Sequence, residues 1–233
     1  MQTDHQDKIT HKNWLNAQEK AQLIALIAAC FKGVDSVAYF QRYFANPAHQ
    51  RCALRLFYQD GQLTGYCLLT FTQSGKATVM GASAAFLPGF RGQNSTFAFS
   101  LRWALRTWLR QPLRPLYYLD TMLSPAMYRA IGKKVALIYP NPAMNAAETA
   151  RYRALVGNAE PSPWRGLGCL KTVGRSSNYS AADLQQLKQS QKAEIAFYCQ
   201  LNPHFEQGIA LLVLIPVSFK QLICTLWKGL RQS

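Results

Sequence analysis

The chain has 233 residues, of which 49% are hydrophobic, so we expect a well-filled core in one large domain or in a domain with an appended segment. It carries 26 lysines and arginines against 11 aspartates and glutamates, a formal net charge of +15. This imbalance attracts polyanions such as nucleic acid, anionic lipid headgroups, acidic carrier proteins or phosphorylated cofactors, and the charge alone does not choose among them.

Cysteine and histidine placement argues against a metal centre. The four histidines show no spacing along a helix face, and no two cysteines form a Cys-x-x-Cys pair. We therefore predict no metal site and a set of reduced core cysteines. The N-terminus is polar and carries Asp4 and Asp7 rather than a secretion signal, so the sequence predicts a cytoplasmic protein.

Two helices are predicted near the N-terminus. Residues Ala17 to Phe31 alternate at helical spacing, with Asn16 as a cap and Gly33 as a stop. Asp35 or the residue after it caps a second helix, which ends before Pro47.

Antiparallel strands are predicted next. Arg51 to Gln59 and Leu63 to Thr72 flank the turn Asp60-Gly61 and form a hairpin. A further turn then leads into the apolar strand Thr78 to Leu87.

The segment from Pro88 to Thr96 joins this strand to a predicted helix, Phe97 to Leu109. A glycine-containing turn between a strand and a helix N-terminus is typical of a phosphate site, because the first helical N–H groups and the helix dipole favour anions. Arg91 would add a charged contact. The alternative is a surface turn whose helix is capped by Asn94 or Ser95.

This helix has an apolar face and a basic face. The apolar face, which we expect to pack on the sheet, consists of Phe97, Leu101, Ala104, Leu105 and Trp108. The basic face consists of Arg102, Arg106 and Arg110. The basic face is either a solvated surface or a contact with an anionic partner.

A strand from Leu116 to Leu123 and a short helix from Ser124 to Gly132 follow. Tyr128 lies in that helix, where its amphipathic side chain suits the edge of the core. Asp120 lies on the strand. Strand alternation leaves the direction of its side chain open, and a structural role is one alternative.

The loop and the short helix together resemble the GNAT acyltransferase superfamily. Its acyl-CoA-binding motif reads Arg or Gln, two residues, Gly, one residue, then Gly or Ala. Arg91 and Gly92 fit the beginning of this motif, whereas Asn94 and Thr96 replace its later small residues. Downstream, Tyr128 is followed four residues later by glycine, as is common in the family.

The resemblance covers about residues 8 to 140 and implies an α/β fold with a mixed, mostly antiparallel sheet flanked by helices. Residues 1–140 would form a GNAT-like acyl-CoA-binding core, and residues 141–233 would be a C-terminal extension packed on it. The implied binding residues for acyl-CoA or acetyl-CoA are Ala85, Phe86, Leu87, Arg91, Gly92, Gln93, Asn94, Ser95 and Thr96.

The implied reaction is direct transfer of an acyl group from acyl-CoA, or from an acyl-carrier protein, to an amine or hydroxyl acceptor. Tyr128 would protonate the departing thiolate, and Asp120 lies beside the site. The alternative is a non-catalytic basic module for nucleic acid or an anionic membrane. Nucleic acid is the less favoured partner, because the aromatic residues mostly follow core spacing and no nucleic-acid motif is present.

In the extension we predict a helix from Ala143 to Val156, a long loop from Pro161 to Tyr179 that borders the acceptor site, and a helix from Ala181 to Leu201. A buried strand follows from Ile209 to Ile215, and Pro216 is expected to open the last helix.

The last helix carries an apolar stripe formed by Phe219, Leu222, Ile223, Leu226, Trp227 and Leu230. The apolar run from Ile209 to Val217, before this helix, is too short to span a bilayer. We expect the stripe to pack on the protein. The alternative is a peripheral position in the interface of an anionic membrane, at its inner face.

Overall fold

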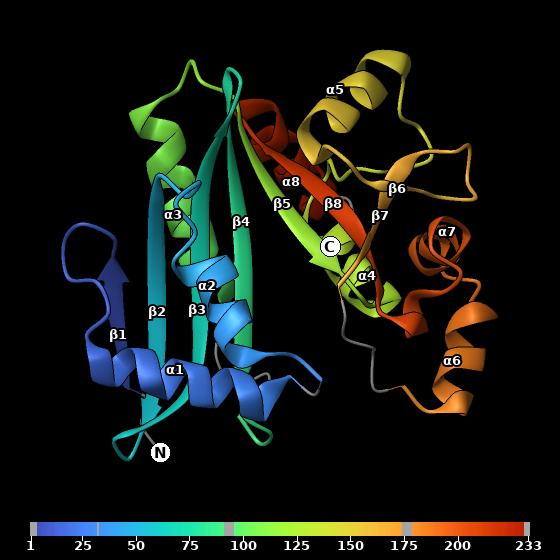
Figure 1. Cartoon of the computed structure of the whole chain (residues 1–233). Helices are drawn as coiled ribbons and strands as arrows, with labels where there is room; N and C mark the ends of the chain where they lie inside the picture. The colour runs from blue at the N-terminus through green and yellow to red at the C-terminus, as the bar shows by residue number, and fades with distance from the viewer. Residues whose placement is uncertain (1–3, 32, 91–95, 174–178, 231–233) are drawn as a thin grey trace. The chain divides into compact units, whose positions relative to one another are not determined.

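A computed structural model describes residues 4–31, 33–90, 96–173 and 179–230 of the chain (Figure 1). The chain divides into two compact units, Met1–Arg114 and Pro115–Ser233, which we call unit 1 and unit 2. Each contains antiparallel strands and helices, so the predicted fold class, α/β with a mostly antiparallel sheet flanked by helices, is confirmed. The predicted boundary after residue 140 lies inside unit 2.

Unit 1 contains four strands and three helices among its described residues. They are β1 (Asp4–Ile9), α1 (Ala17–Cys30), α2 (Ser36–Phe44), β2 (Arg51–Gln59), β3 (Gln62–Ser74), β4 (Ala77–Phe86) and α3 (Thr96–Arg110). The strands pair in chain order, each antiparallel to the next. Helices α1 and α2 cover one face of these strands, and α3 lies on the other (Figure 1).

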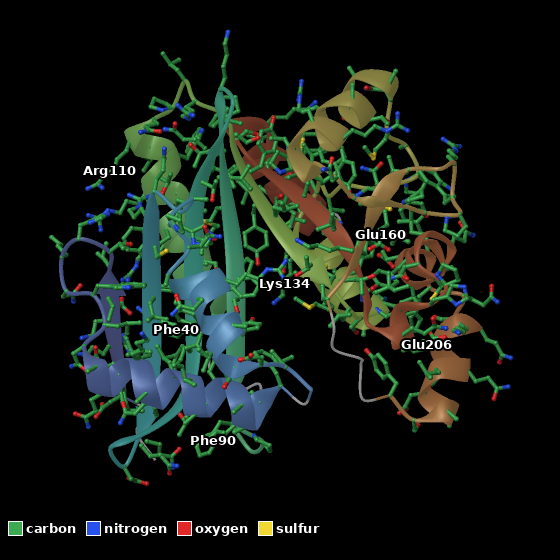
Figure 2. All side chains as sticks on the ribbon, in the orientation of Figure 1. Phe40, Phe90, Arg110, Lys134, Glu160 and Glu206 are labelled. Atoms are coloured by element: carbon green, nitrogen blue, oxygen red, sulfur yellow. The ribbon has the colours of Figure 1, made fainter. Side chains whose placement is uncertain are left out.

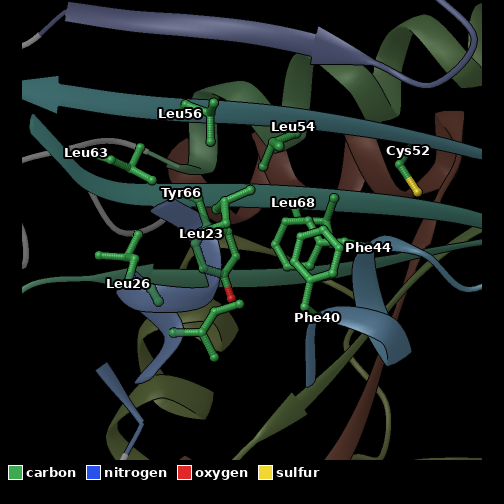
Figure 3. Close-up of a cluster of buried hydrophobic side chains, with 12 residues drawn as sticks. Leu23, Leu26, Phe40, Phe44, Cys52, Leu54, Leu56, Leu63, Tyr66 and Leu68 are labelled. Atoms are coloured by element: carbon green, nitrogen blue, oxygen red, sulfur yellow. The ribbon is translucent and has the colours of Figure 1, made fainter. Parts of the chain in front are cut away.

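The core of unit 1 lies between the strands and helices α1 and α2 (Figure 3). Alternation along β2 and β3 turns Leu54, Leu56, Tyr66 and Leu68 toward these helices. The rings of Phe40 and Phe44 from α2 stack within the same cluster, with centroids 5.0 Å apart.

The helix starts in unit 1 follow the predicted caps. Asn16 accepts a hydrogen bond from the Glu19 amide, and Glu19 accepts one in return from the Asn16 amide, which completes a capping box. Asp35 accepts from the amides of Val37 and Ala38 at the start of α2.

Strand β1 was not predicted. Its sequence, DHQDKI, is mostly polar, and five of its six residues are exposed or half-buried. A bidentate ion pair supports it: Asp7 accepts from Nε and from a terminal nitrogen of Arg55 on β2, at 2.7 and 2.8 Å. This contact lies across strands, so hydropathy along the chain does not show it.

The predicted apolar face of α3 is wrong for Phe97 and Leu101, which are exposed, whereas Leu105 and Trp108 are half-buried. The helix buries Phe99, Trp103, Ala104 and Thr107, of which only Ala104 was expected, and it leaves Phe97 and Leu101 exposed. The reason is the surface beneath. Arg55 lies 4.6 Å from the centre of the Phe99 ring, and Arg51 lies 5.2 Å from that of Trp103, so this face gains cation–π contacts.

Unit 2 has its strands in the order β5, β8, β7, β6, and the neighbours are antiparallel. Its elements are β5 (Leu116–Met122), α4 (Pro125–Lys134), α5 (Ala146–Val156), β6 (Glu160–Pro161), β7 (Gly168–Thr172), α6 (Ala181–Lys188), α7 (Ala193–Leu201), a 3₁₀ turn (Phe205–Gln207), β8 (Ile209–Val217) and α8 (Phe219–Leu230). Strand β8 is central, and residues 210 to 215 of it are buried.

Two differences from the predicted elements lie in the middle of the extension. The expected loop from Pro161 to Tyr179 contains β7, whose residues 170–172 pair with β8. The expected single helix from Ala181 to Leu201 is two helices, α6 and α7, with α7 starting at Ala193. Glycine and proline content predicted the loop, whereas the pairing with β8 is a tertiary contact that this content does not show.

Pro216 lies inside β8, opposite Tyr117, and does not open the last helix. The N–H of Leu214 bonds to the Tyr139 carbonyl, on the side of β8 away from β5. Alternation points the Pro216 nitrogen to that same side, where β8 needs no ladder donor. Helix α8 begins at Phe219, and the Ser218 hydroxyl accepts from the Gln221 amide.

None of the helices in the described ranges combines the length and the hydropathy that a membrane-spanning segment requires.

Candidate active site

The chain leaves β4 through a tight turn. The Phe90 amide donates to the Leu87 carbonyl at 3.0 Å, which closes a four-residue turn with Pro88 and Gly89 at its centre. Gly89 has a φ of 90°, in the left-handed region that favours glycine. Proline at the second position and glycine with positive φ at the third define a type II turn, so the predicted glycine turn is present.

Helix α3 begins at Thr96, which is half-buried, and its first turn carries no acidic side chain. The partial positive charge of the helix dipole is therefore not neutralised there by a carboxylate. The predicted contacts Arg91, Gly92, Gln93, Asn94 and Ser95 lie outside the described residues, so their contact with a phosphate stays a prediction. The strand, the turn and the helix on either side of them are present in unit 1.

At the end of β4, the backbone amides of the three predicted residues Ala85, Phe86 and Leu87 do not all point in the same direction. The Leu87 amide donates to the Thr64 carbonyl at 2.9 Å, so it is used within the strand pairing with β3. Alternation gives the Ala85 amide the same direction and turns the Phe86 amide to the edge away from β3. Phe86 is therefore the residue of the three whose N–H is directed away from this pairing.

The Phe86 side chain lies over a glycine. Its ring packs beside Phe57 with centroids 5.1 Å apart, across Gly65 on the strand between them. A Cβ at Gly65 would lie 2.1 Å from Cδ1 of Phe86, closer than any real contact. The aromatic pair is thus possible because position 65 has no side chain.

A hydroxyl cluster on β4 was not predicted. The Ser83 hydroxyl lies 2.8 Å from the Tyr39 hydroxyl on α2 and 3.0 Å from the Tyr66 hydroxyl on β3. Ser83 and Ala85 share one face of β4, and the cluster lies three positions before Phe86, the last residue of the strand. The sequence signal for it is a serine at a position of β4 that faces the apolar core.

Asp120 is half-buried on β5 in unit 2. Its Oδ2 accepts from the Tyr118 hydroxyl at 3.0 Å, and its Oδ1 accepts from the Thr121 amide at 2.7 Å. Neighbours on the same strand therefore donate to both carboxylate oxygens, which is the geometry expected if Asp120 has a structural role.

Tyr128 is buried in α4, with 3% of its surface exposed. Its hydroxyl donates to the Pro140 carbonyl at 2.7 Å. Burial raises the pKa of Tyr128 well above the usual value, and the charge of Glu194 raises it further. The hydroxyl therefore keeps its proton in this conformation and uses it to satisfy a backbone acceptor.

Two other buried tyrosines of unit 2 behave in the same way. The Tyr152 hydroxyl donates to the Leu212 carbonyl at 2.6 Å, and the Tyr198 hydroxyl donates to the Met122 carbonyl at 2.7 Å. The Tyr128 hydroxyl is thus bonded to a backbone carbonyl in the same way as two tyrosines for which no catalytic role was predicted.

The three arginines of the basic face of α3 are all exposed, and two of them also contact other side chains. Arg102 pairs with Asp7 at 2.9 Å, and Arg106 lies 5.3 Å from the centre of the Trp103 ring. Arg110 is exposed at the end of the helix (Figure 2). Burial lowers the pKa of the nearby Arg51, and the positive charges of Arg110 and Arg106 lower it further.

A small pocket of unit 2 contains none of the predicted residues. It is lined by Tyr117, Tyr139, Glu148, Arg151, Tyr152 and Leu214. Burial, together with the hydrogen bond that its hydroxyl donates to Glu148, raises the pKa of Tyr139 to about 12. Within the described ranges, no three histidine, cysteine or acidic side chains gather as metal ligands would.

No family model matches the chain, and no curated protein matches it. Among solved structures, the chain is similar to an acyl-CoA N-acyltransferase from Pseudomonas aeruginosa, with 18% identity over 60% of this chain and 93% of that one, at a TM-score of 0.39. It is similar to the ribosomal-protein-S18-alanine N-acetyltransferase from Escherichia coli, with 11% identity over 92% and 96% of the two chains, at a TM-score of 0.37.

A third similar structure is Arabidopsis thaliana Naa50 in complex with the bisubstrate analogue CoA-Ac-MVNAL, with 13% identity over 60% and 90% of the two chains, at a TM-score of 0.39. Because these TM-scores lie below 0.5, the function has to be argued from the residues of this chain.

Proposed function

We propose that the protein is an acyltransferase that moves an acyl group from acyl-CoA to an amine or hydroxyl acceptor by direct attack. The observation that carries this proposal is the path from β4 through the type II turn at Pro88-Gly89 to the N-terminus of α3. A strand, a glycine turn and a helix start without acidic side chains favour a bound pyrophosphate. The Arg91 motif occupies this path in the sequence.

The proposed donor site joins backbone and side-chain contacts. Residues 91–96 would hold the pyrophosphate, with Arg91 as its charged partner. The Phe86 amide, which is directed away from β3, would polarise the thioester carbonyl. An acyl-carrier protein would present the same thioester, and it is the alternative donor for a chain of net charge +15.

Asp120 and Tyr128 remain the residues proposed for proton transfer. Each is hydrogen-bonded in the structure, so each would first have to give up a bond to take part in the chemistry. The donor site does not depend on them, and the two parts of the proposal are tested separately.

The nucleic-acid form of the non-catalytic alternative requires aromatic residues that stack on bases. Phe99 and Trp103, which lie beside the arginines of unit 1, are 1% and 5% exposed, so their rings do not offer such a surface. This observation favours the acyltransferase over a nucleic-acid module.

Calorimetric titration with coenzyme A tests the donor site. We expect the wild type to bind, and Arg91→Ala to weaken binding by about tenfold to a hundredfold, because a charge-assisted hydrogen bond is lost. Arg110→Ala is the matched control. It removes the same charge from the other end of α3, about 21 Å from Thr96, and we expect unchanged affinity.

A wild type without affinity for coenzyme A would overturn the proposal. Equal affinities of Arg91→Ala and the wild type would remove the loop from the donor site. Where binding is observed, release of free thiol from acetyl-CoA in the presence of amines then identifies the acceptor class.

A further inference from the structure

Helix α8 is attached to the rest of unit 2 by its polar side chains. Gln221 forms a pair of hydrogen bonds with the backbone of Leu137, since its Oε1 accepts from the amide at 2.8 Å and its Nε2 donates to the carbonyl at 2.9 Å. The Thr225 hydroxyl accepts from the Ala136 amide at 3.1 Å. Residues 132–137, which we call the docking segment, receive these contacts.

Lys228 completes the attachment. Its Nζ donates to the Val135 carbonyl at 3.0 Å and also to the Gly132 carbonyl. Gln221, Thr225 and Lys228 are four and three residues apart, so they share one face of α8. Five directional bonds to backbone groups therefore fix which face of the helix points inward.

The opposite face of α8 is apolar and exposed. Six side chains lie on it, with exposed fractions of 41% to 78%: Phe219, Leu222, Ile223, Leu226, Trp227 and Leu230. The expectation that this stripe packs on the protein is therefore wrong. The backbone groups of the docking segment attract amide, hydroxyl and ammonium groups, and the apolar side chains are left outside.

Such a surface needs an explanation. Large apolar side chains scattered singly over a surface are ordinary, but six on one face of a 12-residue helix form a continuous patch. A patch of this kind marks a contact with another apolar phase or partner.

Exposed lysines lie around the patch. Lys133 and Lys134 are exposed at the end of α4, next to the docking segment, and Lys220 is exposed on α8 itself (Figure 2 labels Lys134). The sequence contains no aspartate or glutamate from residue 207 to 233, and none from 121 to 147. The patch and its rim therefore combine exposed apolar side chains with exposed lysines.

We propose that α8 is an interfacial helix that docks the protein on an anionic lipid surface. Its leucines and aromatic rings would enter the boundary between headgroups and acyl chains, and the lysines would contact the anionic headgroups. A second copy of the chain fits less well, because a two-fold contact through this patch would bring the same lysines face to face. The inference concerns α8 alone and does not depend on acyl transfer.

Sedimentation of the full chain with lipid vesicles tests this proposal. We expect binding to vesicles of phosphatidylcholine mixed with phosphatidylserine, and much weaker binding to phosphatidylcholine alone. Leu222→Gln/Leu226→Gln should reduce binding by at least about tenfold, because apolar area enters the interface and glutamine keeps the helix propensity. Leu109→Gln/Leu113→Gln is the matched control, since these leucines are 69% and 98% exposed in unit 1, and should bind as the wild type does.

A second variant separates the electrostatic contribution. Lys133→Gln/Lys134→Gln should weaken binding to the anionic vesicles and leave the weak binding to neutral vesicles unchanged. Circular dichroism of each variant checks that it is folded.

A wild type that ignores anionic vesicles would overturn the proposal, as would an α8 variant that binds as well as the wild type. Self-association that the α8 variant abolishes, in a protein that ignores vesicles, would assign the patch to a second copy. Loss of vesicle binding in both leucine variants would show non-specific adsorption and would also overturn it.

Discussion

Helices α3 and α8 are both amphipathic and both carry basic residues, yet they use their faces in opposite ways. Helix α3 buries the rings of Phe99 and Trp103 against arginines from β2. Helix α8 buries Gln221 and leaves its large apolar side chains exposed. In each helix, the inward face is the one that complements the surface beneath it.

Apolar spacing therefore identifies a helix but does not decide which of its faces points inward. The strands below α3 present guanidinium groups, which favour aromatic rings. The docking segment below α8 presents backbone donors and acceptors, which favour side chains that form hydrogen bonds. The following substitutions test whether these contacts hold the helices as described.

The largest effect is expected at the buried face of α3. Trp103→Ala should lower the free energy of unfolding by about 3–5 kcal/mol, because it removes a buried ring and leaves a cavity. In α8, Leu226→Ala should change it by less than about 0.5 kcal/mol, because Leu226 is 60% exposed. Chemical denaturation of both variants measures the contrast, and a large loss for Leu226→Ala would mean that the α8 face is covered in the folded protein.

A smaller loss is expected at the polar face of α8. Gln221→Met keeps the size of the side chain but leaves the amide and carbonyl of Leu137 without their partner, so unfolding should become easier by about 1–3 kcal/mol. Gln185→Met on α6 is the control, because Gln185 is exposed. Equal stabilities of the two variants would argue against the inward polar face. The stabilities are compared through the denaturant concentrations at the midpoints of unfolding, provided that the two variants show the same dependence of the unfolding free energy on denaturant.

The smallest of the three destabilising losses is expected at Tyr128, whose hydrogen bond to Pro140 spans the docking segment. Tyr128→Phe should lower the free energy of unfolding by about 1 kcal/mol, because a buried carbonyl loses its donor. Tyr198→Phe loses the same kind of bond and should show a similar loss.

Turnover separates the two roles of Tyr128. If the hydroxyl only supports the fold, both tyrosine variants keep the wild-type kcat once an acceptor is known. A fall in kcat for Tyr128→Phe alone, by one order of magnitude or more, would instead assign the general acid to Tyr128.

Local patterns predicted much of unit 1. Alternating residues and the Asp60-Gly61 turn located the hairpin, and both turn residues have positive φ as such a turn requires. Asn16 and Asp35 located the starts of α1 and α2. These features depend on neighbours along the chain, which is why sequence reasoning found them.

The missed features depend on contacts between distant residues. Strand β1 is polar and is supported by Asp7 and Arg55, which are 48 residues apart. The Ser83 cluster joins three separate elements of unit 1. The spacing of Tyr128 in its motif is present, but spacing does not show that its hydroxyl reaches Pro140.

For the candidate site, the sequence predicted the strand, the turn and the helix around the loop, and the structure has all three. It did not distinguish Phe86 from Ala85 and Leu87, because backbone direction follows from pairing with β3. The loop contacts themselves, from Arg91 to Ser95, stay predictions.

Gly65 links the sheet interior to the proposed donor site without belonging to it. Because a methyl group there would occupy the space of the Phe86 ring, any larger side chain at position 65 has to displace that ring or shift the end of β4. The backbone amide of Phe86 moves with that strand end. In the proposed donor site, a substitution at position 65 would therefore displace the Phe86 amide while every residue of the loop stays the same.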